Sequence, residues 1–104
     1  MENISYEKFY TELNERLKDN NYKVNISLSG IETGAIKPKF SFVQKEFDHI
    51  TLKNHNNVIH ISDIDFFNIK CTATINSEDF VSAWKYDNYY GIRTNNLIIG
   101  VELL

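Results

Sequence analysis

The stretch that decides the fold is 47-FDHITLKNHNNVIHISDIDFFNIKCTATI-75. Residues 50–53 alternate between apolar and polar side chains, which is the period of a strand with one buried face. Residues 55–57, HNN, then supply turn chemistry, because asparagine tolerates a positive φ. Residues 58–61 return as a second strand, and strict alternation resumes over residues 69–75. The stretch therefore predicts three consecutive strands, with a tight turn after the first and a bend before the third.

Two segments outside this meander predict helices. Residues 5–19 place their large apolar side chains on one stripe of helical period, and Ser5 is a suitable N-cap. Residues 77–84 open with Ser77 followed by two acids, a pattern that favours the first turn of a short helix. The first helix has a polar side that we interpret as a solvated face.

Three further segments predict strands. Residues 22–29 alternate strictly, so one of their faces has to be buried. Residues 36–43 are interpreted as a strand in which Pro38 requires a strand start, a bulge or a sheet edge. Residues 91–103 predict a closing hairpin with its turn at residues 94–96.

These elements predict one α+β domain over residues 1–104, the usual size of a single domain. We expect the N-terminal helix to pack on a strongly bent antiparallel sheet, or partly closed small β-barrel, of five to seven strands, with a short helix near residues 77–84. The residues expected in its core share apolar side chains on the inward positions. They are Phe9, Leu13, Val24, Ile26, Leu28, Ile50, Leu52, Ile61, Phe67 and Ile69.

Composition narrows the classes of function. The net charge of −3 and pI near 5.5 argue against a general role on nucleic acid, which requires clustered lysine and arginine. A lone cysteine, Cys71, cannot form an internal disulfide, and a reducing compartment suits it. No apolar run has membrane-spanning length, and the first residues do not form a signal region. We expect a cytoplasmic protein with no membrane partner.

Groups that could carry catalysis or bind a metal are weak in this sequence. His55, His60, Asp63 and Asp65 are the best metal candidates, but their spacing on a strand directs them to different faces. Cys71 lies among apolar residues of an alternating strand, which favours a buried structural thiol over a nucleophile. The glycines form no phosphate-binding loop. We expect no metal, no cofactor, no catalytic residue and no enzymatic activity.

An aromatic cluster near the C-terminal end is the best candidate for a partner-binding site. Its members are Trp84, Tyr86, Tyr89, Tyr90 and Arg93. Tyrosine, tryptophan and arginine are enriched in the hot spots of protein interfaces. The alternative is that most of these rings fill the core. Since Tyr89 and Tyr90 are adjacent on a strand, they cannot both point inward, and at least one is expected to be exposed.

The segment from Val24 to Ile69 resembles the Sm-like small β-barrel proteins. A strand VNISL, a glycine at position 30, a bent second strand, FDHITLKN and VIHISDIDFFNI follow an N-terminal helix in the order of that family. The resemblance implies an RNA-binding barrel that assembles into a ring. Nucleic acid would then contact the lysines of the middle of the chain, which are Lys23, Lys37, Lys39 and Lys53.

A shorter segment, residues 17–30 with the sequence LKDNNYKVNISLSG, follows an acidic amphipathic helix. It is similar to the start of a small anti-CRISPR protein family from phages. That resemblance implies a non-enzymatic inhibitor that acts by contact with a host defence protein. We therefore expect a small protein-binding protein of phage or mobile-element type, with an Sm-like nucleic-acid-binding module as the alternative. The sequence leaves self-association open.

Overall fold

The structure is a computed structural model that describes residues 1–19, 22–31, 42–66 and 69–104. Within these ranges the chain forms one α-helix, α1 (Tyr6–Asp19), and nine strands. The strands are β1 (Glu2–Ile4), β2 (Val24–Gly30), β3 (Phe42–Phe47), β4 (Thr51–His55), β5 (Val58–Phe66), β6 (Ile69–Asn76), β7 (Phe80–Tyr86), β8 (Tyr89–Thr94) and β9 (Leu97–Leu103).

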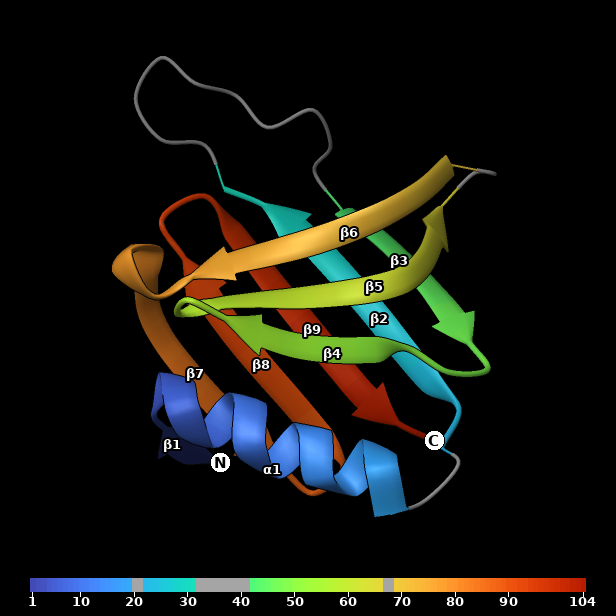
Figure 1. Cartoon of the computed structure of the whole chain (residues 1–104), viewed down its shortest axis with the longest axis horizontal. Coiled ribbons are helices and arrows are strands. Elements are labelled where there is room, and N and C mark those ends of the chain that lie inside the picture. Colours follow the sequence, from blue (N-terminus) through green and yellow to red (C-terminus); the bar gives the residue numbers. More distant parts are fainter. Residues whose placement is uncertain (20–21, 32–41, 67–68) are drawn as a thin grey trace.

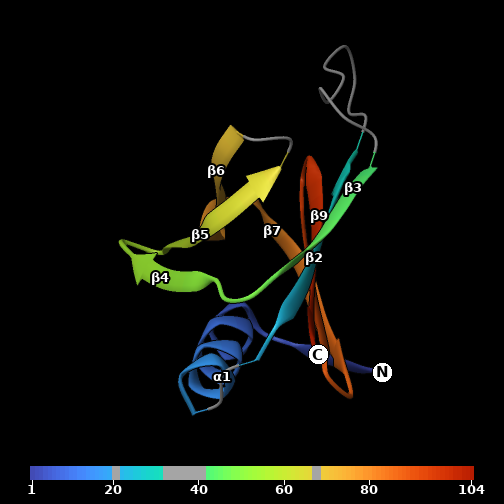
Figure 2. The same ribbon diagram turned by 90° about the vertical axis from the view of Figure 1, so that its right-hand side faces the viewer.

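The strands form two antiparallel sheets. The larger sheet has the order β1-β7-β8-β9-β2-β3, and the smaller one has the order β4-β5-β6. Figure 1 shows α1 and the smaller sheet crossing the larger sheet, and Figure 2 shows that both lie on the same side of it. The expected α+β class with one N-terminal helix is confirmed. The finer expectation of one bent sheet or partly closed barrel of five to seven strands needs correction: the nine described strands divide between a six-stranded and a three-stranded sheet, which do not form a closed barrel.

The predicted meander forms the smaller sheet. Asn56 and Asn57 have φ values of 52° and 61°, which is the left-handed conformation that a two-residue hairpin turn needs at both central positions. The bend within β5 is a bulge between Ile61 and Ile64, where Asp63 has a φ of 63°. The bulge restores the inward direction of Ile64, so both halves of β5 contribute to the core.

The predicted helix at residues 77–84 is largely wrong. Residues Ser77–Asp79 form a single 3-10 turn, and Phe80 already begins β7. The N-cap is Asn76, whose side chain accepts a hydrogen bond of 3.0 Å from the amide of Glu78. The expected cap was Ser77, which is instead the first residue of the turn, and pairing of residues 80–86 with β8 and β1 prevails over helix propagation. Strand β1 was not predicted.

The core lies between the larger sheet and the layer formed by α1 and the smaller sheet. It includes eight of the expected residues, namely Phe9, Leu13, Val24, Ile26, Leu28, Ile50, Leu52 and Ile61. Phe67 lies outside the described residues, and the side chain of Ile69 is not among those described. The expected strand over residues 36–43 is described only from Phe42 onward.

Helix α1 is fixed at its first turn. The Ser5 hydroxyl accepts a hydrogen bond of 3.0 Å from the amide of Lys8, which confirms the expected N-cap. The Tyr6 hydroxyl donates to the carbonyl oxygens of Asn57 and Ile75, at 2.8 and 3.0 Å, and so ties the helix to the smaller sheet. In the described residues, no helix is long and apolar enough to cross a membrane.

Candidate functional site

One face of the larger sheet carries the helix and the smaller sheet, and the other is open along its described strands (Figure 2). We call this second surface the open face. Side chains alternate between the two faces along β7 and β8, and Trp84, Tyr86 and Tyr89 lie on the open face. The strand pairing agrees with this, because Trp84 pairs directly with Gly91 and Tyr86 pairs directly with Tyr89. Arg93 lies there too and is exposed. Tyr90 points the opposite way and is fully buried. The structure thus brings four of the five predicted residues onto one surface.

Two glycines allow the aromatic rings to lie flat against the open face. Gly91 and Gly100 are direct cross-strand partners on β8 and β9. A Cβ atom added at Gly91 would lie 2.3 to 2.5 Å from the indole of Trp84, and one at Gly100 would lie 2.3 Å from the hydroxyl of Tyr89. Both rings therefore rest directly on glycine backbone. Because a strand side chain normally stands away from the sheet, this arrangement is a specific feature of these four residues.

The open face is mixed in charge and partly apolar. Glu102 pairs with Tyr89, and Ile98 pairs with Arg93, so both lie on this surface. Tyr86 is 61% exposed, and Leu104 beyond β9 is 53% exposed. With about 4.8 Å between strands and 3.3 Å per residue, six strands span roughly 500 Å² in projection. That area is comparable with the ~800 Å² that each partner buries in a standard protein interface.

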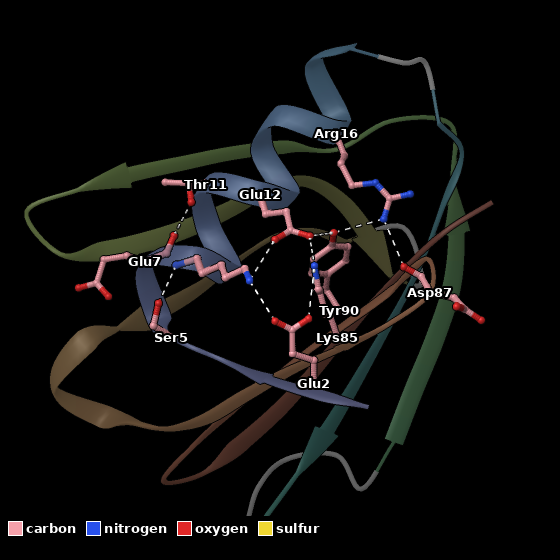
Figure 3. Close-up of polar contacts among 10 residues, drawn as sticks. Glu2, Ser5, Glu7, Thr11, Glu12, Arg16, Lys85, Asp87 and Tyr90 are labelled. Carbon is pink, nitrogen blue, oxygen red and sulfur yellow. Dashed lines mark hydrogen bonds and ion pairs between the residues drawn. The ribbon is translucent and has the colours of Figure 1, made fainter.

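Tyr90 belongs to a polar cluster between α1 and the β7–β8 hairpin (Figure 3). Its hydroxyl donates to Glu12 Oε1 at 2.8 Å, and Lys85 Nζ donates to the same oxygen at 2.6 Å. Lys85 also lies 3.6 Å from the carboxylate of Glu2. The cluster joins β1, α1, β7 and β8, so Tyr90 holds the helix on the sheet rather than contacting a partner.

Arg16 connects this cluster to the tip of the hairpin. Its Nη1 donates to the carbonyl of Asp87 at 3.3 Å, and its Nη2 donates to Asn88 Oδ1 at 2.7 Å. The guanidinium carbon lies 5.7 Å from the ring centroids of both Tyr22 and Tyr90. Helix α1 therefore fixes, from the inner side, the turn whose flanking residues present their rings on the open face.

The charges in the cluster stabilise one another. The hydrogen bond from Lys85 lowers the pKa of Glu12, the bond from Tyr90 and the charges of Lys85 and Lys8 act in the same direction, and burial opposes them. The hydrogen bond to Glu12 raises the pKa of Lys85. Burial raises the pKa of the Tyr90 phenol. Each group thus keeps its ordinary charge at neutral pH, which suits a structural role.

The lysines expected to contact nucleic acid do not form a described patch. Lys23 precedes β2 of the larger sheet, and Lys53 lies on β4 of the smaller sheet; both are exposed. Lys37 and Lys39 lie outside the described residues. Of the two described lysines, one therefore lies just before a strand of the larger sheet and the other on the smaller sheet.

The histidines and acids considered for a metal also stay dispersed. His55 is exposed at the end of β4, His60 pairs with Lys53, and the carboxylate of Asp63 accepts a hydrogen bond from Thr51. Across residues 1–19, 22–31, 42–66 and 69–104, no group of three or more His, Cys, Asp or Glu side chains is arranged to hold a metal ion. The side chain of Cys71 is not among those described.

Three features of this surface were not predicted from the sequence, namely the glycine pair, Glu102 and a shallow pocket beside Tyr86. The pocket has a volume of about 290 Å³ and lies where the β7–β8 turn meets the end of β9. No protein-family model, curated protein or solved structure matches this chain.

Proposed function

We propose that this chain is a small non-enzymatic binding protein that contacts a protein partner through its open face. The observation that carries the proposal is the placement of Trp84 and Tyr89 flat over the paired glycines Gly91 and Gly100. Rings held in this way bury area on binding with little further loss of side-chain entropy. Tyrosine and tryptophan that are part-exposed and pre-positioned are the residues that most often dominate a protein interface.

Charge on the open face supports a protein partner over nucleic acid. Arg93 and Glu102 both lie on the open face. Glu46 lies there too, because it pairs with Asn25, which in turn pairs with Glu102. Exposed carboxylates repel phosphates, whereas a mixed surface suits a protein with complementary charges. Aromatic stacking alone would also suit single-stranded nucleic acid, but such platforms lie in basic grooves.

The similarity of residues 17–30 to an anti-CRISPR family extends the proposal to the kind of partner. We propose a cytoplasmic phage or mobile-element protein that inhibits a host defence protein. The alternative, an Sm-like nucleic-acid-binding module, is separated from it by salt dependence. A protein interface dominated by tyrosine contacts weakens only mildly with salt, whereas phosphate contacts through lysines weaken steeply.

The test is capture of a partner from host lysate, followed by titration of the purified partner at two salt concentrations. Replacing Tyr86 and Tyr89 together with alanine should reduce affinity by about 1–3 kcal/mol, with a shallow salt slope for the wild type. The matched control is His55→Ala, because His55 is an exposed ring at the end of β4 in the smaller sheet, away from the open face. Full binding by the folded double variant, or a steep salt slope, would contradict the proposal.

A further inference from the structure

We propose that the pocket at the end of the open face receives an arginine side chain of the protein partner. The proposal rests on the proposed function and specifies the chemistry that this surface recognises. The pocket is lined by residues 86–89 and 102–104. Its volume of about 290 Å³ is at the small end of the ~300–1,000 Å³ range of ligand sites and is large enough for one long side chain.

The lining combines two features that attract a planar cation. Tyr86 and Tyr89 are direct cross-strand partners, and their side chains share one face of the sheet. A guanidinium group stacks on such rings through cation–π attraction. Glu102 pairs with Tyr89 on the next strand, and so its carboxylate lies on the same face as the rings. An arginine that stacks on a ring can donate to this carboxylate at the same time.

Charge complementarity selects the occupant. The described lining residues contribute two carboxylates, from Asp87 and Glu102, and no lysine or arginine side chain. Figure 3 shows the Asp87 carboxylate pointing away from Arg16, which bonds to the backbone carbonyl of Asp87 and not to its carboxylate. Asp87 and Glu102 are both exposed, so a cation of the partner can reach their carboxylates. A phosphate or a carboxylate in this pocket would face like charges.

The pocket is also pre-formed. Asp87 has a φ of 52°, and the amide of Leu103 donates to the carbonyl of Asn88 at 2.8 Å, so the turn is bonded to the end of β9. The amide of Leu104 donates to the carbonyl of Lys23 at 2.8 Å. With Arg16 bonded to the turn from the other side, both walls are fixed before a ligand arrives, which reduces the entropic cost of binding.

The test uses N-acetyl-arginine amide as the probe and backbone amide chemical shifts of the full chain as the readout. We expect saturable shift changes at residues 86–89 and 102–104 in the millimolar range. N-acetyl-citrulline amide, which has nearly the same shape and no charge, should bind at least roughly fivefold more weakly. The double variant Asp87→Asn with Glu102→Gln should weaken arginine binding by a similar factor, while its spectrum reports that it is folded.

The matched control is Glu78→Gln, which removes one negative charge from the 3-10 turn and should leave binding unchanged. Equal binding of arginine and citrulline, shifts at other residues, or full binding by the double variant would overturn the inference. So would the absence of shifts at residues 86–89 and 102–104. Because the probe needs no partner, failure here leaves the capture experiment with the tyrosine variants to decide the proposed function separately.

Discussion

Gly91→Ala is expected to lift the single tryptophan off the sheet. The added Cβ would lie 2.3, 2.4 and 2.5 Å from three atoms of the Trp84 indole, whereas carbon atoms in ordinary contact are about 3.5–4.0 Å apart. The indole therefore has to move outward by roughly 1–1.5 Å. Overpacking of this kind costs about 1–3 kcal/mol. Replacing glycine in a strand gains back roughly 0.5–1 kcal/mol, so a net loss of about 1 kcal/mol remains.

Because the chain has one tryptophan, its fluorescence reports this movement directly. The emission of Gly91→Ala should shift to longer wavelength as the indole becomes more hydrated, and chemical unfolding should show the loss of stability. Gly100→Ala is the matched control, since its Cβ meets Tyr89 and Ser27 and should change the emission much less. In a Trp84→Ala background the clash is absent, and Gly91→Ala should then be neutral or stabilising. Unchanged emission and stability in the single variant would refute the placement of the ring.

Three further changes test the packing and the polar cluster. Leu28→Ala should lower the free energy of unfolding by about 2–5 kcal/mol, because Leu28 is a core side chain; an unchanged melting temperature would contradict its inward register. Tyr6→Phe should cost roughly 1 kcal/mol in denaturant unfolding, because it removes the hydroxyl that donates to the carbonyls of Asn57 and Ile75, while the Asn57 carbonyl still accepts from the amide of Ser77. Glu12→Gln should lower stability at neutral pH by roughly 1 kcal/mol. The folded pKa of Glu12 is depressed below its ordinary value near 4.5, so its contribution is present above pH 4.5 and disappears as the pH falls through the folded pKa. Unfolding curves of the wild type and this variant should therefore converge in acid, and a constant difference down to low pH would show that the Glu12 charge is not responsible.

Local patterns predicted the individual strands well, because the direction of a side chain depends only on its position along the strand. Val24, Ile26 and Leu28 are all buried, as strict alternation required. The turn at Asn56 and Asn57 was equally accessible, since it depends on the φ preference of the residues themselves.

Sheet pairing was harder to predict, because alternation does not specify which strands meet. β2 pairs with β9, about 70 residues away in sequence, and β1 pairs with β7. A three-residue strand such as Glu2–Ile4 has no detectable period of its own. The residues after Asp79 show the same difficulty. The capping signal can be recognised from neighbouring residues, but the pairing with β8 that ends the helix involves residues distant in sequence.

The candidate site was predicted in composition but not in arrangement. The opposite directions of Tyr89 and Tyr90 followed from their adjacency, but only the packing of α1 shows that Tyr90 is the inner one. The glycine pair could have been found, because a turn of Asn95 and Asn96 alone sets Gly91 opposite Gly100. The three-residue turn predicted at residues 94–96 shifts the pairing by one residue, so that Gly91 no longer lies opposite Gly100. Glu102 joined the site only once β9 was placed beside β8.

The central claim is that the open face is the surface that meets the partner. Hydroxyl-radical footprinting of the chain alone and in its purified complex measures this directly, because tyrosine and tryptophan side chains react readily. We expect protection of Trp84, Tyr86 and Tyr89 in the complex, with unchanged reactivity at Tyr10 and Tyr22, which lie on and after α1. Protection of Tyr10 and Tyr22 with unchanged reactivity at Tyr86 would contradict it.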